Sequence, residues 1–252
     1  MKKKNSDFVS VIIPYYKKIK YFHKALSSVL NQDYKNLEIM IIYDDKDRED
    51  LKFIRKKIKR FKRIKLIINK KNLGAGKSRN KAAKNAKGKY LAFLDSDDVW
   101  KKNKLKQQLN FMKKNKLDIS HTAYSIINDK SKIVSYRVAR NKSSYSNLLN
   151  SCDIGLSTVI IKKKLFLKYK FSSNKTKEDY SLWLKLSRKK NIYGLNKELA
   201  SWRKLDNSLS SNTLQKIFDA FDIYYRQEKF NFILSITKVI ILSFNFLKKS
   251  WF

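Results

Sequence analysis

The first hundred residues alternate short apolar runs with amphipathic segments, and this alternation constrains the fold more than any other feature of the 252-residue chain. Nearly continuous apolar runs are typical of strands that are buried on both faces. Between them, apolar residues recur at helical spacing. The pattern therefore predicts an α/β fold, with a mostly parallel sheet covered by helices on both faces. The expected strands span residues 8–13, 37–43, 65–69 and 90–94, and one expected helix spans 75–86.

Three of the expected strands end in residues that are suited to ligand binding. The first runs into Pro14-Tyr15-Tyr16, the second into Asp44-Asp45, and the fourth into Asp95-Ser96-Asp97-Asp98. Open parallel sheets bind ligands outside the carboxyl ends of their strands. The sequence therefore predicts a binding site at this edge of the sheet.

The acidic run at the end of the fourth strand indicates a metal site. Residues two apart in an extended chain point to the same side, so the carboxylates of Asp95 and Asp97 can converge. Such hard oxygen ligands suit Mg²⁺ or Mn²⁺, which often complete their shell with substrate phosphates. We expect Asp98 to cap the following helix, predicted over residues 101–114.

Other candidate residues carry weaker signals. Asp45 is positioned to accept hydrogen bonds from a base or a ribose hydroxyl. Residues 72–80 form a loop leading into a helix, on which Arg79 can meet a phosphate or the metal-site carboxylates. The segment Gly76-Lys77-Ser78 is similar to the end of a phosphate-binding loop. That motif requires a glycine at position 71, however, and this chain has Lys71 there, so we reject a phosphate-binding loop. Glu178-Asp179 opens a helix, where acidic residues are common because of the helix dipole.

Taken together, these segments resemble the family 2 glycosyltransferases, which have the GT-A fold. The resemblance covers about residues 8–210, and it rests on the order and spacing of several modest motifs. It implies a Rossmann-like, mostly parallel sheet flanked by helices, with a small mixed sheet and a C-terminal helical tail. The matching segments are residues 9–16, 28–32, 38–45, 72–80, 88–98 and 178–183.

The resemblance also implies a reaction and roles for residues. The reaction is an inverting transfer from a nucleoside diphosphate sugar to an acceptor hydroxyl. Asp179 is the implied general base, with Glu178 beside it in the substrate site. Trp183 either walls the acceptor pocket or belongs to the core. By the same resemblance the nucleoside is bordered by Pro14, Tyr15 and Asp45, with Arg79 nearby. The resemblance also implies that Asp95 and Asp97 hold a divalent metal, Mg²⁺ or Mn²⁺, on the diphosphate.

Substrates are expected from the family alone. A UDP-sugar is the first expectation for the donor, a glycan or lipid-linked molecule for the acceptor, and cell-surface polysaccharide or lipopolysaccharide for the product. The chain departs from the family pattern at Tyr16, at Lys46-Asp47 and at Leu205. These departures keep open the alternative of a catalytically degenerate partner protein.

The charge of the chain suggests a rival function. Fifty-nine basic and 21 acidic residues give a formal net charge of +38, which favours polyanionic partners. The lysines are dispersed, however, and no nucleic-acid-binding motif accompanies them, so we expect no specific nucleic acid. Codon bias and a functional basic surface both remain explanations for the charge. A nucleotidyltransferase is disfavoured because the first strand is not followed by a glycine-rich loop.

The chain divides into a catalytic domain, residues 1–210, and C-terminal amphipathic helices, residues 211–252. Within the domain, residues 8–100 form the expected nucleotide-sugar half and 101–210 the acceptor half. The apolar tail from Phe230 to Phe252 is interrupted by Lys238, which favours an interfacial helix with Trp251 and Phe252 as anchors on an anionic membrane. A helix packed on the catalytic domain is the alternative. A single cysteine and no signal peptide predict a cytoplasmic protein, peripheral on the membrane if the tail binds lipid.

Overall fold

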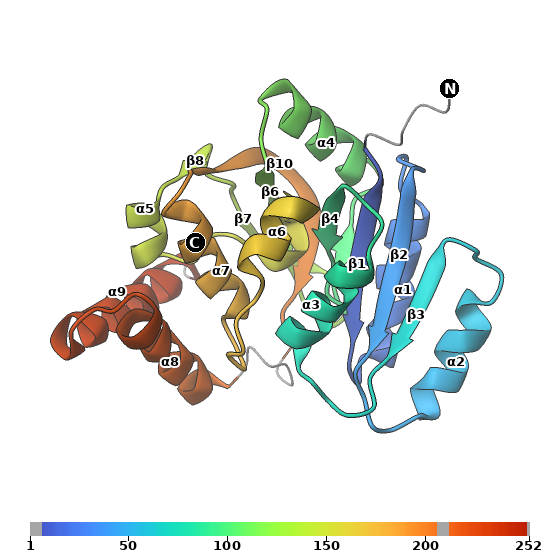
Figure 1. Cartoon of the computed structure of the whole chain (residues 1–252), viewed down its shortest axis with the longest axis horizontal. Coiled ribbons are helices and arrows are strands. Elements are labelled where there is room, and N and C mark those ends of the chain that lie inside the picture. The colour runs from blue at the N-terminus through green and yellow to red at the C-terminus, as the bar shows by residue number, and fades with distance from the viewer. Residues whose placement is uncertain (1–6, 206–211, 251–252) are drawn as a thin grey trace.

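The computed structural model describes residues 7–205 and 212–250, which form one sheet with helices on both faces (Figure 1). Along the main path of the sheet the strand order is β3-β2-β1-β4-β9-β6-β10-β5, with β7 beside β6 and β8 beside β10. Strands β1 to β4, from the half predicted to bind the nucleotide sugar, occupy one side of this sheet, and the mixed strands together with β5 occupy the other.

The predicted strand and helix alternation of the first hundred residues is confirmed. The four strands pair in parallel, with β1 between β2 and β4 and with β3 outside β2. Each connection is a helix, as parallel strands require. The elements are β1 (Val9–Tyr15), α1 (Ile19–Leu30), β2 (Leu37–Tyr43), α2 (Glu49–Ile58), β3 (Ile64–Ile68), α3 (Ala75–Asn85) and β4 (Tyr90–Phe93).

Both faces of this parallel sheet are buried, because side chains alternate along each strand. Val9, Val11 and Ile13 of β1 join a core cluster beneath α1, α2 and α4. Ile12 points the other way, into a cluster with α3, α6 and α7. The covering helices not yet bounded are α4 (Lys104–Lys114), α6 (Lys163–Tyr169) and α7 (Glu178–Ser187).

The second half has the mixed strand directions expected of residues 101–210. Strand β9 runs antiparallel to both β4 and β6, whereas β10 runs parallel to β6. A short helical turn, η1 (Leu156–Thr158), precedes β9. The remaining elements are β5 (Val99–Trp100), β6 (Ile119–Ile127), β7 (Ile133–Arg137), β8 (Lys142–Ser143), α5 (Tyr145–Asn150), β9 (Ile160–Lys162) and β10 (Ile192–Arg203).

The C-terminal helices pack against the rest of the molecule. They are α8 (Thr213–Asp222), η3 (Ile223–Gln227) and α9 (Phe232–Ser250). Val239 and Leu242 of α9 are buried in the same core cluster as α7. Lys238 Nζ donates to Asn150 Oδ1 of α5 at 2.9 Å, and Asn245 Nδ2 donates to Asn150 O at 2.8 Å. The inner side of α9 therefore packs on the catalytic domain, which was the alternative to an interfacial helix.

Two expectations for the tail concern residues outside the described ranges. The expected membrane anchors, Trp251 and Phe252, lie outside these ranges. The expected domain boundary, between residues 210 and 211, also lies outside them. Over residues 7–205 and 212–250, no helix combines the length and the apolar character needed to cross a bilayer.

Candidate active site

The acidic turn Asp95–Asp98 joins β4 to β5 at the carboxyl edge of the parallel strands. Asp98 is buried and accepts hydrogen bonds from Ser157 Oγ at 2.5 Å and from the Arg203 backbone N–H at 2.8 Å. Ser157 Oγ in turn accepts the Asp95 backbone N–H at 3.0 Å. The expectation that Asp98 caps the next helix is wrong, because α4 begins at Lys104 and the carboxylate of Asp98 is occupied in fixing the turn.

Arg79 connects the acidic turn to the first turn of α7. Its side chain is buried, and it extends from α3. One guanidinium nitrogen, Nη1, donates to Glu178 Oε1 at 2.6 Å, and Nη2 donates to Asp95 Oδ1. Residues 79, 95 and 178, which are far apart in the sequence, therefore form one ion-paired cluster.

Carboxylates outnumber cations in this cluster, since Arg79 interacts electrostatically with Asp95, Glu178 and Asp179. Burial raises the pKa of Glu178 to about 7, which outweighs the opposing attraction of Arg79. Loss of hydration likewise raises the pKa of Asp179. For Arg79 the charges of Asp95 and Glu178 outweigh the effect of burial and raise the pKa. The site therefore carries excess negative charge.

Asp97 adds a further carboxylate to the same edge. Burial and the neighbouring charge of Asp95 raise its pKa, and Lys18 Nζ lies 3.7 Å from its Oδ2. Within the described ranges no three His, Cys, Asp or Glu side chains are grouped so as to hold a metal. The protein thus offers Asp95 and Asp97 as a pair of hard, mutually repelling donors. This pair fits a Mg²⁺ or Mn²⁺ ion whose remaining ligands are phosphate oxygens and water.

Asp179 lies in the first turn of α7 with a defined orientation. Its Oδ1 accepts the Tyr180 backbone N–H at 2.7 Å. Its Oδ2 accepts no hydrogen bond from residues of the described ranges, and the residue is partly exposed. A carboxylate held in this way, with a raised pKa, can accept a proton from a bound hydroxyl group.

At the end of β1 the side chain of Tyr15 does not border an open site. It is fully buried, its ring stacks on Tyr43 with centroids 5.2 Å apart, and its hydroxyl donates to Asp50. The alternation of β1 turns this ring into the core, so the predicted place of Tyr15 beside the nucleoside does not involve its side chain. Pro14 and Tyr16 are the residues with exposed surface here.

The two aspartates after β2 have different surroundings. Asp44 Oδ1 accepts hydrogen bonds from Asn69 Nδ2 and from the Leu73 backbone N–H, both at 2.8 Å, so this residue fixes the loop before α3. Asp45 Oδ1 accepts the Asp47 backbone N–H at 3.2 Å. Its Oδ2 has no hydrogen-bond donor among the residues described, which leaves this oxygen available to a ligand.

Trp183 has a core role, which was one of its two expected roles. This side chain is fully buried in the cluster that also contains the core residues of α9. Its Nε1 finds no hydrogen-bond acceptor in the described part of the chain. The expectation that Trp183 walls an acceptor pocket is corrected, because helical spacing turns it inward.

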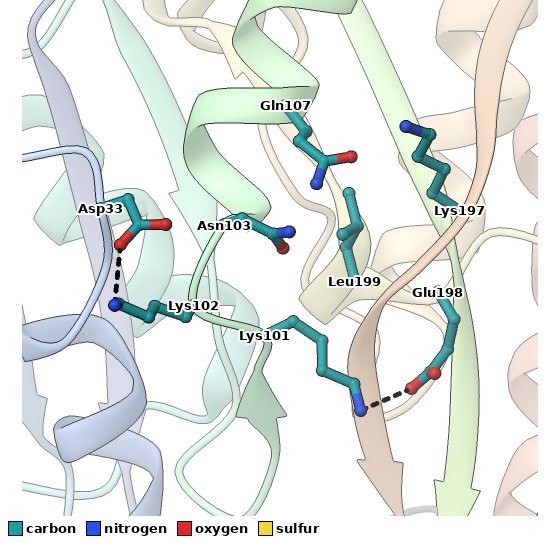
Figure 2. A pocket seen from close by; sticks show the side chains of 8 residues that line it. All are labelled: Asp33, Lys101, Lys102, Asn103, Gln107, Lys197, Glu198 and Leu199. Atoms are coloured by element: carbon teal, nitrogen blue, oxygen red, sulfur yellow. Dashed lines mark ion pairs between the residues drawn. The ribbon is translucent and has the colours of Figure 1, made fainter.

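Two pockets flank this region without including the acidic turn. One, of about 510 Å³, lies between the start of α4 and β10, where Lys101 pairs with Glu198 and Lys102 with Asp33 (Figure 2). It contains none of the residues predicted to carry the chemistry. The second, of about 480 Å³, has a polar lining from residues 172–175, which precede α7, and from α8 and Gln227. This pocket adjoins the segment that presents Asp179.

Comparison with known proteins identifies the family. The sequence profile described as "Glycosyl transferase family 2" matches residues 10–173. The chain belongs to this family. It is a glycosyltransferase.

Relatives within family 2 include enzymes that the chain matches over most of their length. It is 37% identical over 219 residues to the Escherichia coli enzyme named UDP-Glc:alpha-D-GlcNAc-diphosphoundecaprenol beta-1,3-glucosyltransferase WfgD, covering 85% of this chain and 84% of that one. It is 34% identical to the putative teichuronic acid biosynthesis glycosyltransferase TuaG of Bacillus subtilis, covering 96% of each chain. An uncharacterized glycosyltransferase of Rickettsia conorii is 40% identical over 202 residues, but the match spans only 33% of its length.

Solved structures establish the GT-A fold. Staphylococcus aureus TarS in complex with UDP-GlcNAc superposes with a TM-score of 0.70 at 23% identity, over 86% of this chain and 64% of that one. A mannosyltransferase of Pyrobaculum calidifontis, in complex with GDP-Man and Mn²⁺, gives a TM-score of 0.69 at 13% identity, over 89% and 65% of the chains. The fold expected from the resemblance is therefore confirmed.

Sequence reasoning missed the residues that position the acidic turn. Ser157 holds both Asp95 and Asp98, yet it lies about sixty residues away and has no motif. Lys18, near Asp97, belongs to a lysine-rich stretch and is not distinguished by its type. Neither carries a local signal, because each acts through contacts that exist only in the folded chain.

Proposed function

We propose that this family 2 enzyme transfers a hexose, with inversion, from a nucleoside diphosphate sugar to an acceptor hydroxyl. The main support is the single cluster in which Arg79 joins Asp95 of the acidic turn to Glu178, beside Asp179. The diphosphate and the acceptor must meet at one place for an in-line displacement. This cluster connects a diphosphate-binding edge to a base in that way.

Asp179 is the proposed general base. Inversion requires one group to take the proton from the acceptor oxygen as that oxygen attacks the anomeric carbon. Asp179 Oδ2 takes this proton, while the hydrogen bond from the Tyr180 N–H to Oδ1 keeps the carboxylate in place. Glu178 holds Arg79, so its role is to position the cluster within the substrate site.

Asp95 and Asp97 are the proposed metal ligands. A divalent Mg²⁺ or Mn²⁺ held there supplies charge neutralisation for the departing diphosphate. Burial and then the neighbouring charge of Asp95 raise the pKa of Asp97, and a bound cation would relieve the repulsion between these two carboxylates, which supports this assignment. So does the Mn²⁺ in the complex of the Pyrobaculum mannosyltransferase.

The nucleoside is proposed to lie at the ends of β1 and β2. Pro14 offers partly exposed apolar surface, and Asp45 offers Oδ2 to a base N–H or a ribose hydroxyl. A uridine nucleotide is the proposed donor, since TarS binds UDP-GlcNAc and WfgD is named as a UDP-Glc enzyme.

The acceptor is proposed to be a glycan carried on a lipid diphosphate, used at the cytoplasmic face of a membrane in the synthesis of cell-surface polysaccharide. The lipid diphosphate named as the acceptor of WfgD supports this class, and the assignment of TuaG to teichuronic acid biosynthesis supports a polysaccharide product. The polar pocket lined by residues 172–175 lies beside the segment that leads into α7, and its polar lining is suited to hydroxyl-rich ligands.

The donor site is tested by thermal shift with nucleoside diphosphates and their sugars, with and without Mn²⁺. We expect at least one of them, UDP first, to stabilise the protein in a metal-dependent way. Asp97→Ala should abolish this response. Asp33→Ala, which alters an exposed ion pair in the other pocket, is the matched control and should keep it. A response in Asp97→Ala equal to that of the wild type would show that Asp97 does not bind the metal.

The base is tested by Asp179→Asn, which keeps the size and one oxygen of the side chain. We expect donor binding to persist and sugar transfer to fall by roughly 10²–10⁴-fold, the usual contribution of general base catalysis. Transfer at the normal rate in this variant would refute the assignment of Asp179.

A further inference from the structure

The surface of α8 and α9 is apolar on its outer side. Of the eighteen large hydrophobic side chains exposed within the described ranges, twelve lie between residues 214 and 247. Figure 1 shows α8 and α9 at one end of the molecule, far from the β3 edge of the sheet. Exposed apolar surface that gathers in one region indicates an interaction site.

Helix α9 is apolar on both of its sides. Its inner stripe, Ser235, Val239 and Leu242, is buried against the core. Its outer residues Ile236, Ile240 and Phe244 follow one another at helical spacing, and their exposed fractions are 39%, 62% and 64%. A helix packed on a globular domain normally turns polar residues outward. A helix with an exposed apolar stripe opposite its buried one needs a second apolar environment.

Helix α8 extends this apolar surface. Phe221 of α8 stacks on Tyr225 with centroids 5.4 Å apart and meets Phe232 of α9 edge-on at 5.6 Å. Near the other end of α9, Lys216 Nζ of α8 lies 5.5 Å from the centroid of the Phe246 ring. Together with the exposed side chains of Leu214 and Phe218, these contacts give the two helices one outer surface, which we call the α8–α9 apolar face.

The charges around this face match an anionic partner. Helix α9 contains no acidic residue, and its last turns carry Lys248 and Lys249. The two acidic residues of α8 are directed into the protein: Asp219 Oδ2 accepts from Thr176, and Asp222 Oδ2 accepts from Asn174 Nδ2 at 3.2 Å. The chain as a whole carries +38, so repulsion between copies disfavours burying this face in a second copy.

We propose that the α8–α9 apolar face docks on the surface of an anionic lipid bilayer, with both helices lying in its interface. An amphipathic helix of this kind inserts its apolar side among the lipid headgroups and is strengthened by nearby lysines. This proposal rests on the proposed function, because it gives the lipid-linked acceptor a defined direction of approach.

Docking through α8 would bring the lipid surface to the helix that holds the segment before α7. The Thr176 backbone N–H and Oγ1 both donate to Asp219 Oδ2 at 2.7 Å. Thr176 lies three residues before Asp179. The helix that contacts lipid on its outer side therefore holds, on its inner side, the segment that carries the proposed base, and a headgroup-borne hydroxyl is brought to that base.

The test is flotation of the full chain with vesicles of phosphatidylcholine, with and without phosphatidylglycerol. We compare the wild type with the triple variant Ile236→Glu, Ile240→Glu, Phe244→Glu. The matched control is Ile133→Glu, Val134→Glu, Val138→Glu, which makes the same charge change on exposed apolar residues around β7. Thermal unfolding of each variant checks that it is folded.

We expect the wild type and the β7 variant to float with the anionic vesicles, and more weakly with phosphatidylcholine alone. The α9 variant should partition at least roughly tenfold less, because three apolar side chains no longer enter the interface. Equal flotation of the two triple variants would overturn the proposal. So would a dimer, detected by light scattering, that the α9 substitutions dissociate in a chain that does not float.

Donor binding separates the two proposals. Stabilisation by UDP and Mn²⁺ should be the same in the wild type and in both triple variants. If that stabilisation is intact and flotation fails, only the docking surface is refuted. If flotation behaves as expected and no nucleotide binds, the proposed function is refuted while the docking surface stands.

Discussion

At the scale of single residues, the site is shaped by an imbalance of buried charge. The guanidinium of Arg79 interacts electrostatically with Asp95, Glu178 and Asp179, and burial raises the pKa of Glu178 and of Asp179. A divalent cation or a bound proton relieves this imbalance. The same imbalance sets the pH at which Asp179 can act.

The first prediction concerns the pH dependence of transfer. A base acts only when deprotonated, and the pKa of Asp179 lies above the ordinary aspartate value of 3.8. Activity should therefore be lost as the pH falls through this raised pKa. Lys177→Gln removes a cation that lowers this pKa, so the acid limb of kcat/KM should move to higher pH. If the acid limb of kcat/KM stays at the same pH or moves to lower pH in this variant, the titration belongs to another group.

The second prediction concerns Arg79. Arg79→Met leaves the buried Glu178 and the partly exposed Asp95 without their cation, which should lower the free energy of unfolding by about 3–5 kcal/mol, mostly through Glu178. Carboxyl groups whose pKa is raised on folding stabilise the protein while protonated and lose this effect as the pH rises. The decrease in the free energy of unfolding caused by Arg79→Met should therefore be larger at neutral pH than in mild acid. Urea unfolding at both pH values measures it.

Arg79→Lys is the matched variant for this prediction. It keeps the cation but cannot donate to both carboxylates in a fork, so its loss should be smaller. A pH-independent loss of equal size in the two variants would show that packing, and not charge, accounts for the effect.

At the scale of elements, the acidic turn is a junction of three segments. It leaves β4, its Asp98 binds η1 through Ser157, and the same carboxylate binds β10 through the Arg203 N–H. Arg203 Nε also donates to the Asp97 carbonyl at 2.8 Å. The position of the turn therefore depends on elements that enter the chain much later.

The third prediction follows from this junction. Ser157→Ala removes the donor to Asp98 and the acceptor for the Asp95 N–H. The free energy of unfolding should fall by about 1–3 kcal/mol, the cost of leaving buried polar groups unpaired. Metal-dependent stabilisation by the nucleotide should weaken as well. Ser157→Thr, which keeps the hydroxyl, should restore most of that stabilisation. An equal loss of stabilisation in both variants would show that packing around residue 157, and not the hydroxyl, accounts for the effect.

At the scale of the whole molecule, α9 belongs to the folded core and also supplies an outer surface. Leu242 is 5% exposed and lies in the cluster that contains the core residues of α7. The helix is further held by the two hydrogen bonds to Asn150. The tail therefore folds with the catalytic domain and is not a separate appendage.

The fourth prediction separates these two sides of α9. Leu242→Ala should lower the free energy of unfolding by about 2–5 kcal/mol, because it opens a cavity in the core. Ile240→Ala, two positions earlier and 62% exposed, should change it by less than about 0.5 kcal/mol. Denaturant unfolding measures both, and similar losses would mean that the outer side of α9 is also packed.

The sequence by itself determined the alternation of parallel strands and helices and the order of the polar strand ends. Both follow from local periodicity, which a chain expresses before it folds. It also indicated Asp95 and Asp97 through their spacing, while Asp179 was implied by the resemblance to the family. Only the tertiary structure decided that Tyr15 and Trp183 face the core, since burial depends on which elements cover a strand or helix.

The tertiary structure alone also assigned Asp98 to the junction with Ser157 and Arg203, and it turned Lys238 inward toward Asn150. Periodicity within one segment does not show which distant donor will meet a carboxylate or a lysine. Contacts between residues that are this far apart in the chain exist only when the fold brings their elements together, and for that reason they leave no pattern in the sequence.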